Sequence, residues 1–138
     1  MLTCAFCSIA AGQTPASLVW EDEISLAFLD ARPLFPGHTL LIPRVHYETL
    51  LDLPPELLAP LFGNAQRLAR AVVDALGAEG SFVAVNNRIS QSVPHLHIHV
   101  VPRRARDGLK GFFWPRQKYP DEAERDRVRD LLRAAMRG

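Results

Sequence analysis

Three histidines at alternating positions form the strongest chemical signal in the sequence. His95, His97 and His99 lie in the stretch SVPHLHIHVVPRR, residues 92–104, with one apolar residue in each gap. Successive side chains of a β-strand point to opposite faces of its sheet. A strand over 94–102 therefore presents all three imidazoles on one face and buries the intervening apolar residues on the other.

The spacing favours a division of labour among the three imidazoles over a shared metal ion. At a rise of ~3.3 Å per residue the outer pair is ~13 Å apart at Cα, so two neighbours can share a zinc ion but the third reaches it poorly. A central neutral imidazole whose other nitrogen is hydrogen-bonded can attack phosphorus. A flanking histidine, when protonated, can supply positive charge to the developing oxyanion, since the pKa of histidine lies near the working pH. The sequence holds neither a P-loop nor a carboxylate cluster suited to magnesium, which fits catalysis by histidine.

The surrounding sequence predicts the elements that would hold these histidines. Turn residues and apolar periodicity indicate two short strands within 17–33 around an acidic turn, a strand over 38–42, a helix within 53–80, a strand over 81–87 and a charged helix over 121–138. Pro60 falls in the first two turns of the long helix and predicts a kinked or delayed start. Tight turns between the early strands and a single helical crossover favour an α+β fold with an antiparallel sheet over a doubly wound parallel sheet.

Composition limits the classes of protein to which the chain can belong. Its 138 residues suit one domain, 1–138, and a net charge of +1 argues against a surface that coats a nucleic acid polymer. No apolar run is long enough to span a membrane, and the N-terminus lacks the pattern of a signal peptide. Two cysteines three positions apart are no secreted disulfide framework, so we expect a cytoplasmic protein without a membrane partner.

Beyond the triplet, the sequence resembles the histidine-triad (HIT) family over roughly residues 4–104. The segments CAFCSIAAG, LAFLDARPLFPGHTLLIPRVHYETL, VNN and QSVPHLHIHVVPR are similar to family segments in the same order. The resemblance implies a HIT-like fold and a nucleotide hydrolase or nucleotidyl transferase. Such an enzyme releases a nucleoside monophosphate from phosphoramidates or dinucleoside polyphosphates through a covalent nucleotidyl-histidine. It also implies an adenine nucleotide as the default substrate and a homodimer.

Two other functions stay open on the sequence alone. A nucleotide-binding regulatory protein would carry the same triplet with little turnover, although an intact triplet counts against it. A metal-dependent hydrolase would use the histidines as ligands and would lose its chemistry with chelators. Loss of a structural zinc would mimic that effect by unfolding the protein, so retention of the fold after metal removal separates the two.

The resemblance implies a role for each residue of the catalytic stretch. His97 would be the nucleophile, and the main-chain carbonyl of His95 would orient its ring. His99 would contact the phosphate or the leaving group. Gln91 and Ser92 would hydrogen-bond the phosphate oxygens; the alternative for this pair is a polar turn without a catalytic role.

The resemblance also implies residues that hold the nucleotide. Asp30 would accept hydrogen bonds from the ribose hydroxyls, as a carboxylate can from two donors at once. Asn86, with Asn87 as a rival, would approach the phosphate. The following loop, 88–90, is shorter than in the family and has no glycine, so Arg88 would supply a charge in place of backbone N–H groups. The base pocket would be lined by Phe6, Ile9 and Phe28.

The pair Cys4-x-x-Cys7 alone fits half of a zinc site, a redox pair or two ordinary thiols. A redox pair would normally open a helix in a thioredoxin-like context, and nothing downstream indicates one, so no redox cofactor is expected. The resemblance implies a structural zinc ion held by Cys4, Cys7, His46 and His95. We interpret His38 as structural.

The tail, 103–138, is expected to be a variable C-terminal extension. Basic residues in 103–120 alternate with four aromatic ones, Phe112, Phe113, Trp114 and Tyr119. These aromatic side chains either pack the C-terminal helix against the sheet or form a flap that stacks on a base or leaving group. In the flap interpretation a phosphate would meet Arg103, Arg104 or Arg116.

Overall fold

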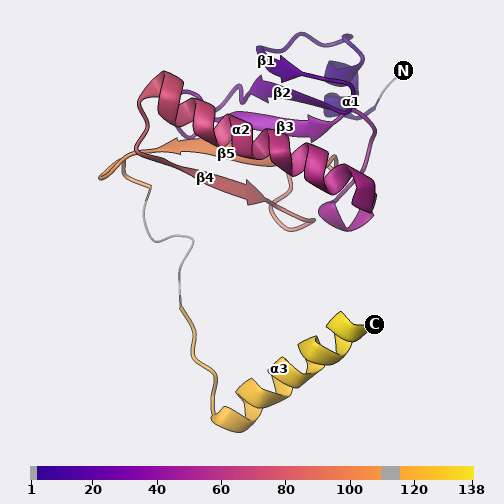
Figure 1. Cartoon of the computed structure of the whole chain (residues 1–138), viewed down its shortest axis with the longest axis vertical. Helices are drawn as coiled ribbons and strands as arrows, with labels where there is room; N and C mark the ends of the chain where they lie inside the picture. Colours follow the sequence, from indigo (N-terminus) through magenta and orange to yellow (C-terminus); the bar gives the residue numbers. More distant parts are fainter. Residues whose placement is uncertain (1–2, 110–115) are drawn as a thin grey trace. The chain divides into compact units, whose positions relative to one another are not determined.

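The computed structural model describes residues 3–109 and 116–138, which belong to two compact units, Met1–Asp107 and Gly108–Gly138. In the first unit a short helix, α1 (Ala5–Ala10), precedes five strands, and a long helix, α2 (Leu58–Leu76), lies between the third and fourth (Figure 1). The second unit holds helix α3 (Glu122–Arg137). No helix in the described part of the chain combines the length and the apolarity that a membrane span requires.

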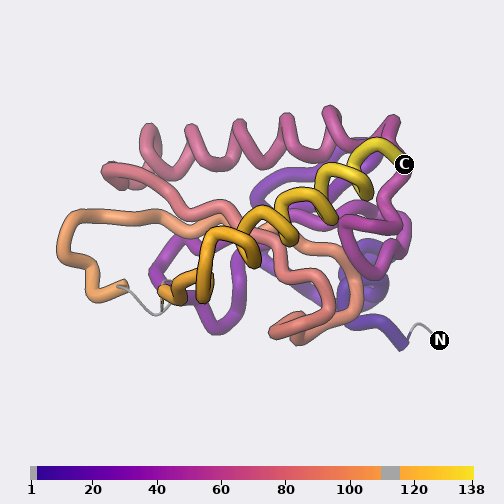
Figure 2. Tube along the Cα trace, turned by 90° about the horizontal axis from the view of Figure 1, so that it is seen from below, coloured from indigo at the N-terminus to yellow at the C-terminus, as the bar shows by residue number. Residues whose placement is uncertain are grey.

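The sheet is antiparallel throughout, with the strand order β1-β2-β3-β5-β4. Its strands are β1 (Leu18–Glu21), β2 (Ser25–Leu29), β3 (Thr39–Pro43), β4 (Gly80–Val85) and β5 (Ile98–Arg103). Helix α2 forms a separate layer on one face, where it contacts β3, β4 and β5 (Figure 2). The prediction of an α+β fold with an antiparallel sheet, one long helix and a C-terminal helix is confirmed.

The two faces of the sheet bury different sets of residues. Leu96, Ile98 and Val100, the apolar partners of the histidines, are fully buried against the inner face of α2. That inner face has the spacing of an amphipathic helix and carries Leu61, Ala65, Leu68 and Val72. On the opposite face a second apolar cluster joins α1 to β2 and β3 through Phe6, Leu26, Phe28, Leu40 and Ile42. We call this the α1 face, and the histidines lie on it.

Helix α2 is shorter than its periodic sequence predicts. Two 3₁₀ turns, Leu50–Asp52 and Pro55–Leu57, precede it, and its α-helical residues begin at Leu58. Pro60 lies in the first turn, where a missing N–H has no intrahelical partner to lose, so the proline delays the start without breaking the helix. Gly77 ends the helix with φ 69°, a left-handed conformation that glycine adopts without a steric penalty.

The strand that carries the histidines begins later than the sequence predicts. β5 starts at Ile98, so His95 and His97 lie in an irregular segment before it. In that segment the Leu96 N–H donates to the Tyr47 carbonyl oxygen at 2.7 Å, a bond to a loop and not to a strand. The expected alternation of faces still holds, because Leu96, Ile98 and Val100 belong to the cluster with α2, whereas His95 and His97 pack against Phe6 of α1.

The same strand also continues beyond Pro102, which the sequence predicts as its end. β5 runs to Arg103, but β3 pairs with it only between Ile98 and Val100. The missing N–H at Pro102 therefore breaks no hydrogen bond to β3, and Pro102 is paired only with Ser81 of β4. The predicted strands over 38–42 and 81–87 are confirmed as β3 and β4, with boundaries that differ by one or two residues.

Helix α1 is not predicted from the sequence, because six residues carry too little periodicity to be distinguished from a loop. Cys4 caps it, and its Sγ accepts the Cys7 N–H at 3.4 Å. In the tail, the predictions for Phe112, Phe113 and Trp114 fall outside the described residues. Tyr119 is 58% exposed and no residue of α3 is buried, so the two interpretations of these aromatic side chains stay predictions.

The acidic turn between β1 and β2 depends on the carboxylate of Asp22. Its Oδ1 accepts the N–H groups of Ile24 and Ser25 at 3.0 and 2.8 Å, and its Oδ2 accepts Asn64 Nδ2 of α2 at 2.7 Å. Burial alone would raise the pKa of Asp22, but these hydrogen bonds, led by that from Asn64, outweigh it and lower the pKa to about 2. The carboxylate thus ties the first hairpin to the helix.

We expect Asp22→Ala to lower the free energy of unfolding at pH 7 by about 1–2 kcal/mol, because it removes hydrogen bonds to a charged acceptor. The pKa is 3.8 for an unperturbed aspartate and about 2 in the fold, so this contribution is complete above pH 3.8 and is lost as the pH falls toward 2. Urea denaturation at pH 7 and pH 2 measures both effects. Glu23→Ala, at the exposed neighbouring carboxylate, is the control, and equal losses in the two variants would contradict the prediction.

Candidate functional site

A cavity of about 560 Å³ opens on the α1 face beside the histidine triplet. His97 and His99 line it together with Asp30 and Ser92. Its apolar walls come from α1, β2, β3 and the segment before β5, and include Phe6, Ile9, Phe28, Leu40 and Val93. The structure therefore brings together predicted catalytic and base-pocket residues from distant parts of the chain.

The imidazole of His97 is buried and has a fixed tautomer. Its Nδ1 lies 2.8 Å from the main-chain carbonyl oxygen of His95, which can only accept, so Nδ1 carries the proton. Nε2 is then unprotonated and can act as a nucleophile or a base. Phe6 packs edge-on against the ring, with centroids 5.1 Å apart and planes at 86°, which restricts its rotation. The contact with the His95 carbonyl is the one that the family resemblance implies.

The tautomer of His99 is fixed by a chain of two hydrogen bonds. The Leu34 N–H donates to His38 Nδ1 at 3.0 Å, so the neutral His38 ring carries its proton on Nε2. That Nε2 lies 3.0 Å from His99 Nδ1, which must accept. His99 therefore keeps its own proton on Nε2, as a hydrogen-bond donor for a ligand in the cavity. The interpretation of His38 as structural missed this contact, because nothing in the sequence links positions 61 residues apart.

Both members of this pair are neutral near pH 7. Burial, followed by the proximity of His97 and His38, lowers the pKa of His99 to about 4. Burial likewise lowers the pKa of His38, although the nearby Asp30 carboxylate opposes the shift. The expectation that a flanking histidine supplies a full positive charge is therefore wrong for His99, which contributes a neutral N–H donor instead.

Asp30 lies at the end of β2, where its carboxylate borders the cavity. One oxygen accepts the Arg32 main-chain N–H at 2.9 Å, and the other lies 3.7 Å from His38 Nε2. The side chain is 25% exposed, so both oxygens retain lone pairs for further donors. A pair of ribose hydroxyls is a ligand of the right chemistry for this position.

Only one of the four residues predicted to surround the phosphate lines the cavity as the structure describes it. Ser92 lines the cavity, whereas Gln91, Asn86 and Arg88 are not among the described lining residues. Gln91 holds the loop instead: its Nε2 donates to the Glu48 carbonyl oxygen at 2.6 Å and its Oε1 accepts the Arg88 N–H at 2.8 Å. The phosphate-binding roles of these three residues stay predictions.

The loop that carries them is strained. Arg88 and Ser90 have φ of 72° and 60°, in the left-handed region that favours glycine. Each such residue costs about 1–2 kcal/mol relative to an extended or right-handed conformation. The absence of glycine in 88–90 is thus compensated by the side-chain bonds of Gln91 and by the Asn87 Oδ1, which accepts the Leu50 N–H at 2.9 Å.

A second cluster, at the N-terminus of α1, has the chemistry of a metal site. The Sγ atoms of Cys4 and Cys7 and the Nδ1 atoms of His46 and His95 all lie within 4.8 Å of one another. Cys4 Sγ and Cys7 Sγ are 3.4 and 3.5 Å from His95 Nδ1, and His46 Nδ1 is 3.2 Å from it. Ligands at 2.0–2.3 Å from a tetrahedral zinc ion are separated by about 3.3–3.8 Å, so the four atoms fit one.

His95 links this cluster to His97. Its Nε2 lies 2.9 Å from the Pro43 carbonyl oxygen and therefore carries the proton, which leaves the Nδ1 lone pair for a metal. The ring is fully buried, and burial lowers its pKa, so it stays neutral. Its main-chain carbonyl is the acceptor that fixes His97. One residue thus contributes to both sites with different atoms.

A third group of candidate metal ligands, Asp30, His38 and His99, does not fit a metal ion as it stands. A histidine that binds a metal through Nε2 carries its proton on Nδ1. In His38 that Nδ1 already accepts the Leu34 N–H, so a proton there would face another proton. The hydrogen bonds of this cluster suit neutral imidazoles, which argues against a metal ion held by Asp30, His38 and His99 together.

We expect His99 to populate both neutral tautomers in the variant His38→Ala. In the wild type a long-range ¹H–¹⁵N spectrum should show His99 protonated on Nε2 alone. The variant should show a mixture, because His99 Nδ1 no longer accepts a hydrogen bond from His38. Unchanged signals of His95 and His97 would show that the fold is retained. A single, unaltered His99 tautomer in the variant would contradict this prediction.

Comparison with known proteins places the chain among relatives of known activity. The HIT domain model matches residues 11–106. Adenylylsulfatase HINT3 of Arabidopsis thaliana is 39% identical over 108 residues, which are 77% of this chain and 55% of that protein, so the chain spans about half of its length. Adenosine 5'-monophosphoramidase hnt1 of Schizosaccharomyces pombe is 36% identical over 125 residues, 89% of this chain and 90% of that protein.

A solved structure supports the same relationship. The zinc-bound histidine triad family protein from Mycobacterium smegmatis is 43% identical, with a TM-score of 0.74 over 96% of this chain and 92% of that chain. The domain match covers more than half of the sequence and includes the cavity residues Asp30, Ser92, His97 and His99. The chain therefore belongs to the HIT, or histidine-triad, family.

Proposed function

We propose that the protein is a nucleotide hydrolase that transfers a nucleoside monophosphate to His97 and then to water. One observation carries the proposal: the His95 carbonyl holds the proton of His97 on Nδ1, which leaves Nε2 as a nucleophile in a cavity. The activities named for the plant and yeast relatives both concern adenylyl compounds. Asp30 and the apolar walls give this cavity the chemistry to hold a ribose and a base.

The reaction proceeds in two displacements at phosphorus. In the first, His97 Nε2 forms a bond to phosphorus, and the bond to the leaving group breaks with its electron pair, which a proton from solvent then neutralises. In the second, a water oxygen attacks phosphorus, loses its proton and displaces Nε2, so the nucleoside monophosphate leaves and neutral His97 is restored. His99 Nε2–H and the Ser92 hydroxyl are the donors that would stabilise the phosphoryl oxygens. An alcohol or amine in place of water would give transfer.

The charge of the cavity favours phosphoramidates over dinucleoside polyphosphates. Among the described residues that line it, Arg32 alone carries a permanent positive charge, and its side chain is exposed. His99, with its pKa of about 4, adds none at neutral pH. A polyphosphate leaving group with several negative charges would be poorly neutralised here, whereas an amine leaves as a neutral or cationic species. Adenosine 5'-phosphoramidate is therefore the first substrate proposed.

The proposal includes a structural zinc ion on Cys4, Cys7, His46 and His95. A zinc ion bound there would supply a rigid tetrahedral link between α1, the segment after β3 and the segment before β5. The spacing of the four ligand atoms and the zinc-bound mycobacterial relative support it. No catalytic step passes through the metal.

A homodimer is the third part of the proposal. β4 is the last strand of the sheet, and Val83 on it is 43% exposed. An edge strand can add the same strand of a second copy across a two-fold axis, which extends the sheet and covers the edge. The family resemblance implies such a pairing, and the exposed edge offers the surface for it.

We expect His97→Ala to reduce the hydrolysis of adenosine 5'-phosphoramidate by about 10⁴-fold or more, because the nucleophile is removed. Release of AMP measures the rate, and mass spectrometry after an alkaline quench should detect the nucleotidyl adduct in the wild type alone. Diadenosine polyphosphates should be cleaved more slowly than the phosphoramidate. Ile89→Ala, on the exposed surface of the neighbouring loop, is the control. Equal rates for wild type and His97→Ala would reject the mechanism.

We expect protein purified without chelators to contain about one zinc ion per chain, and Cys4→Ser to contain much less, because one of four ligands is weakened. Elemental analysis measures the metal. Hydrogen exchange of Ala5–Ala10 should increase in the variant, since the metal holds the start of α1. Ser8→Ala, in the same helix but outside the ligand set, is the matched control. Undiminished zinc in Cys4→Ser would contradict the site.

A further inference from the structure

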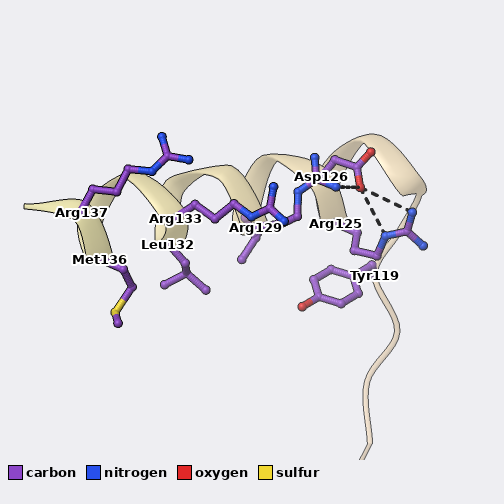
Figure 3. Close-up of a pocket in the computed structure, with 9 residues that line it drawn as sticks. Tyr119, Arg125, Asp126, Arg129, Leu132, Arg133, Met136 and Arg137 are labelled. Atoms are coloured by element: carbon purple, nitrogen blue, oxygen red, sulfur yellow. Dashed lines mark hydrogen bonds and ion pairs between the residues drawn. The ribbon is translucent and has the colours of Figure 1, made fainter.

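The hollow along α3 and the loop 86–91 both lie outside the described lining of the cavity beside His97. In the hollow, Leu132, Met136 and Tyr119 project from one side of the helix (Figure 3). In the described part of that unit no second helix or strand faces them, so no contact specifies a partner. The loop differs, because hydrogen bonds to another segment of its own unit hold its side chains in place.

Ser92, directly after this loop, lies between two hydrogen bonds that tie the chain to the segment after β3. On one side Gln91 Nε2 donates to the Glu48 carbonyl oxygen at 2.6 Å. On the other side the Leu96 N–H donates to the Tyr47 carbonyl oxygen at 2.7 Å. The two acceptors belong to adjacent residues, so the chain from 91 to 96 forms an arch that is fixed at both ends. Ser92 lines the cavity from one end of this arch.

The segment that accepts these bonds is itself held by a capped turn. The N–H and the hydroxyl of Thr49 both donate to Asp52 Oδ2 at 2.9 Å, and Thr49 Oγ1 accepts the Leu51 N–H at 3.1 Å. Thr49 is also buried. Glu48 directly precedes this turn, so the position of its carbonyl oxygen is set by the fold and not by the loop.

The loop, in contrast, is under strain. Arg88 and Ser90 have φ of 72° and 60°, values that a Cβ disfavours and that glycine adopts freely. Without a tie, both residues would relax toward a right-handed or extended conformation and would move the chain that follows. Gln91 Oε1 accepts the Arg88 N–H at 2.8 Å, so one strained residue is itself bonded to the side chain.

A single amide group thus performs two tasks. The Arg88 N–H can only donate and the Glu48 carbonyl oxygen can only accept, so these partners determine which end of the Gln91 amide is oxygen and which is nitrogen. The amide connects the strained residue to the fixed carbonyl. Loss of either bond would leave the loop free to relax and the arch with one end untied.

We propose that Gln91 is a positioning residue, which holds the strained loop against Glu48 and thereby sets the Ser92 hydroxyl at the phosphoryl group. This role rests on the function proposed above, in which Ser92 donates to the phosphoryl oxygens. It takes the place of a direct bond from Gln91 to the phosphate. Each polar atom of the Gln91 amide already has a partner, and Gln91 is not among the described residues that line the cavity.

Relief of the strain tests whether Gln91 holds the loop. In Gln91→Ala we expect the hydrogen-exchange protection factors of residues 88–93 to fall at least tenfold, because the loop loses its tie. Adding Arg88→Gly should restore at least threefold of this loss, since glycine adopts a φ of 72° without a steric penalty. Arg88→Ala in the same background is the matched control: it removes the same charge, keeps the Cβ and should restore nothing.

A double-mutant cycle with Ser92→Ala tests whether Gln91 acts through Ser92. With adenosine 5'-phosphoramidate as substrate, we expect Gln91→Ala to lower kcat about tenfold and to change KM less than threefold. The double variant should be no slower than Ser92→Ala alone, because the interaction that Gln91 positions is already lost. Gln66→Ala, on α2 and outside the loop, is the control and should change neither constant. Circular dichroism shows whether each variant is folded.

Three results would overturn the proposal. These are unchanged protection in Gln91→Ala, equal recovery with Arg88→Gly and Arg88→Ala, and losses of kcat that multiply in the double variant. Multiplied losses together with a raised KM would indicate that Gln91 contacts the phosphate directly. A wild type that releases no AMP would reject the proposed function instead. The protection factors do not depend on turnover and would still decide whether Gln91 holds the loop.

Discussion

The hydrogen bond from His97 Nδ1 to the His95 carbonyl oxygen is the interaction on which the site depends. It decides which nitrogen of His97 is free, and it does so through the main chain, which a side-chain substitution cannot easily remove. His95 itself is held at two further atoms, by the Pro43 carbonyl oxygen at Nε2 and by the Cys4 sulfur and the His46 imidazole at Nδ1. The position of the His97 ring therefore depends on every contact that fixes His95.

Burial favours the neutral forms of His38, His95 and His99. Desolvation is the largest cause of the lowered pKa values of His38, His95 and His99, and it acts on rings that are each hydrogen-bonded in one tautomer. Neutral imidazoles can serve as nucleophile, acceptor and donor in fixed directions, whereas protonated rings would repel one another at centroid separations of about 5 Å. Because these pKa values lie below the unperturbed 6.5, the unfolded chain takes up protons first, and stability is lost as the pH falls from 6.5 toward 4.

The sequence predicts the parts of the fold that repeat a pattern. The alternation around His97 and the long periodicity of α2 are regular enough to assign faces, and both assignments are confirmed. The start of β5 could not be predicted, because the bond that holds Leu96 reaches a loop carbonyl, Tyr47, that no local pattern specifies. His38 was missed for the same reason: its role comes from a contact with a residue 61 positions away.

Helix α1 contributes residues both to the candidate metal cluster and to the cavity beside His97. Its six residues include Phe6, which packs on His97 and Phe28, and Cys7, which belongs to the metal cluster, with Cys4 as its cap. So short a helix is not stable by itself, because the unfavourable free energy of helix nucleation exceeds the stabilisation from the hydrogen bonds that six residues can form. Its stability must come from the apolar cluster on one side and from the contacts of the Cys4 and Cys7 sulfurs on the other. A substitution at either place is therefore expected to disturb the cavity wall that Phe6 forms and the packing of Phe6 on the His97 ring together.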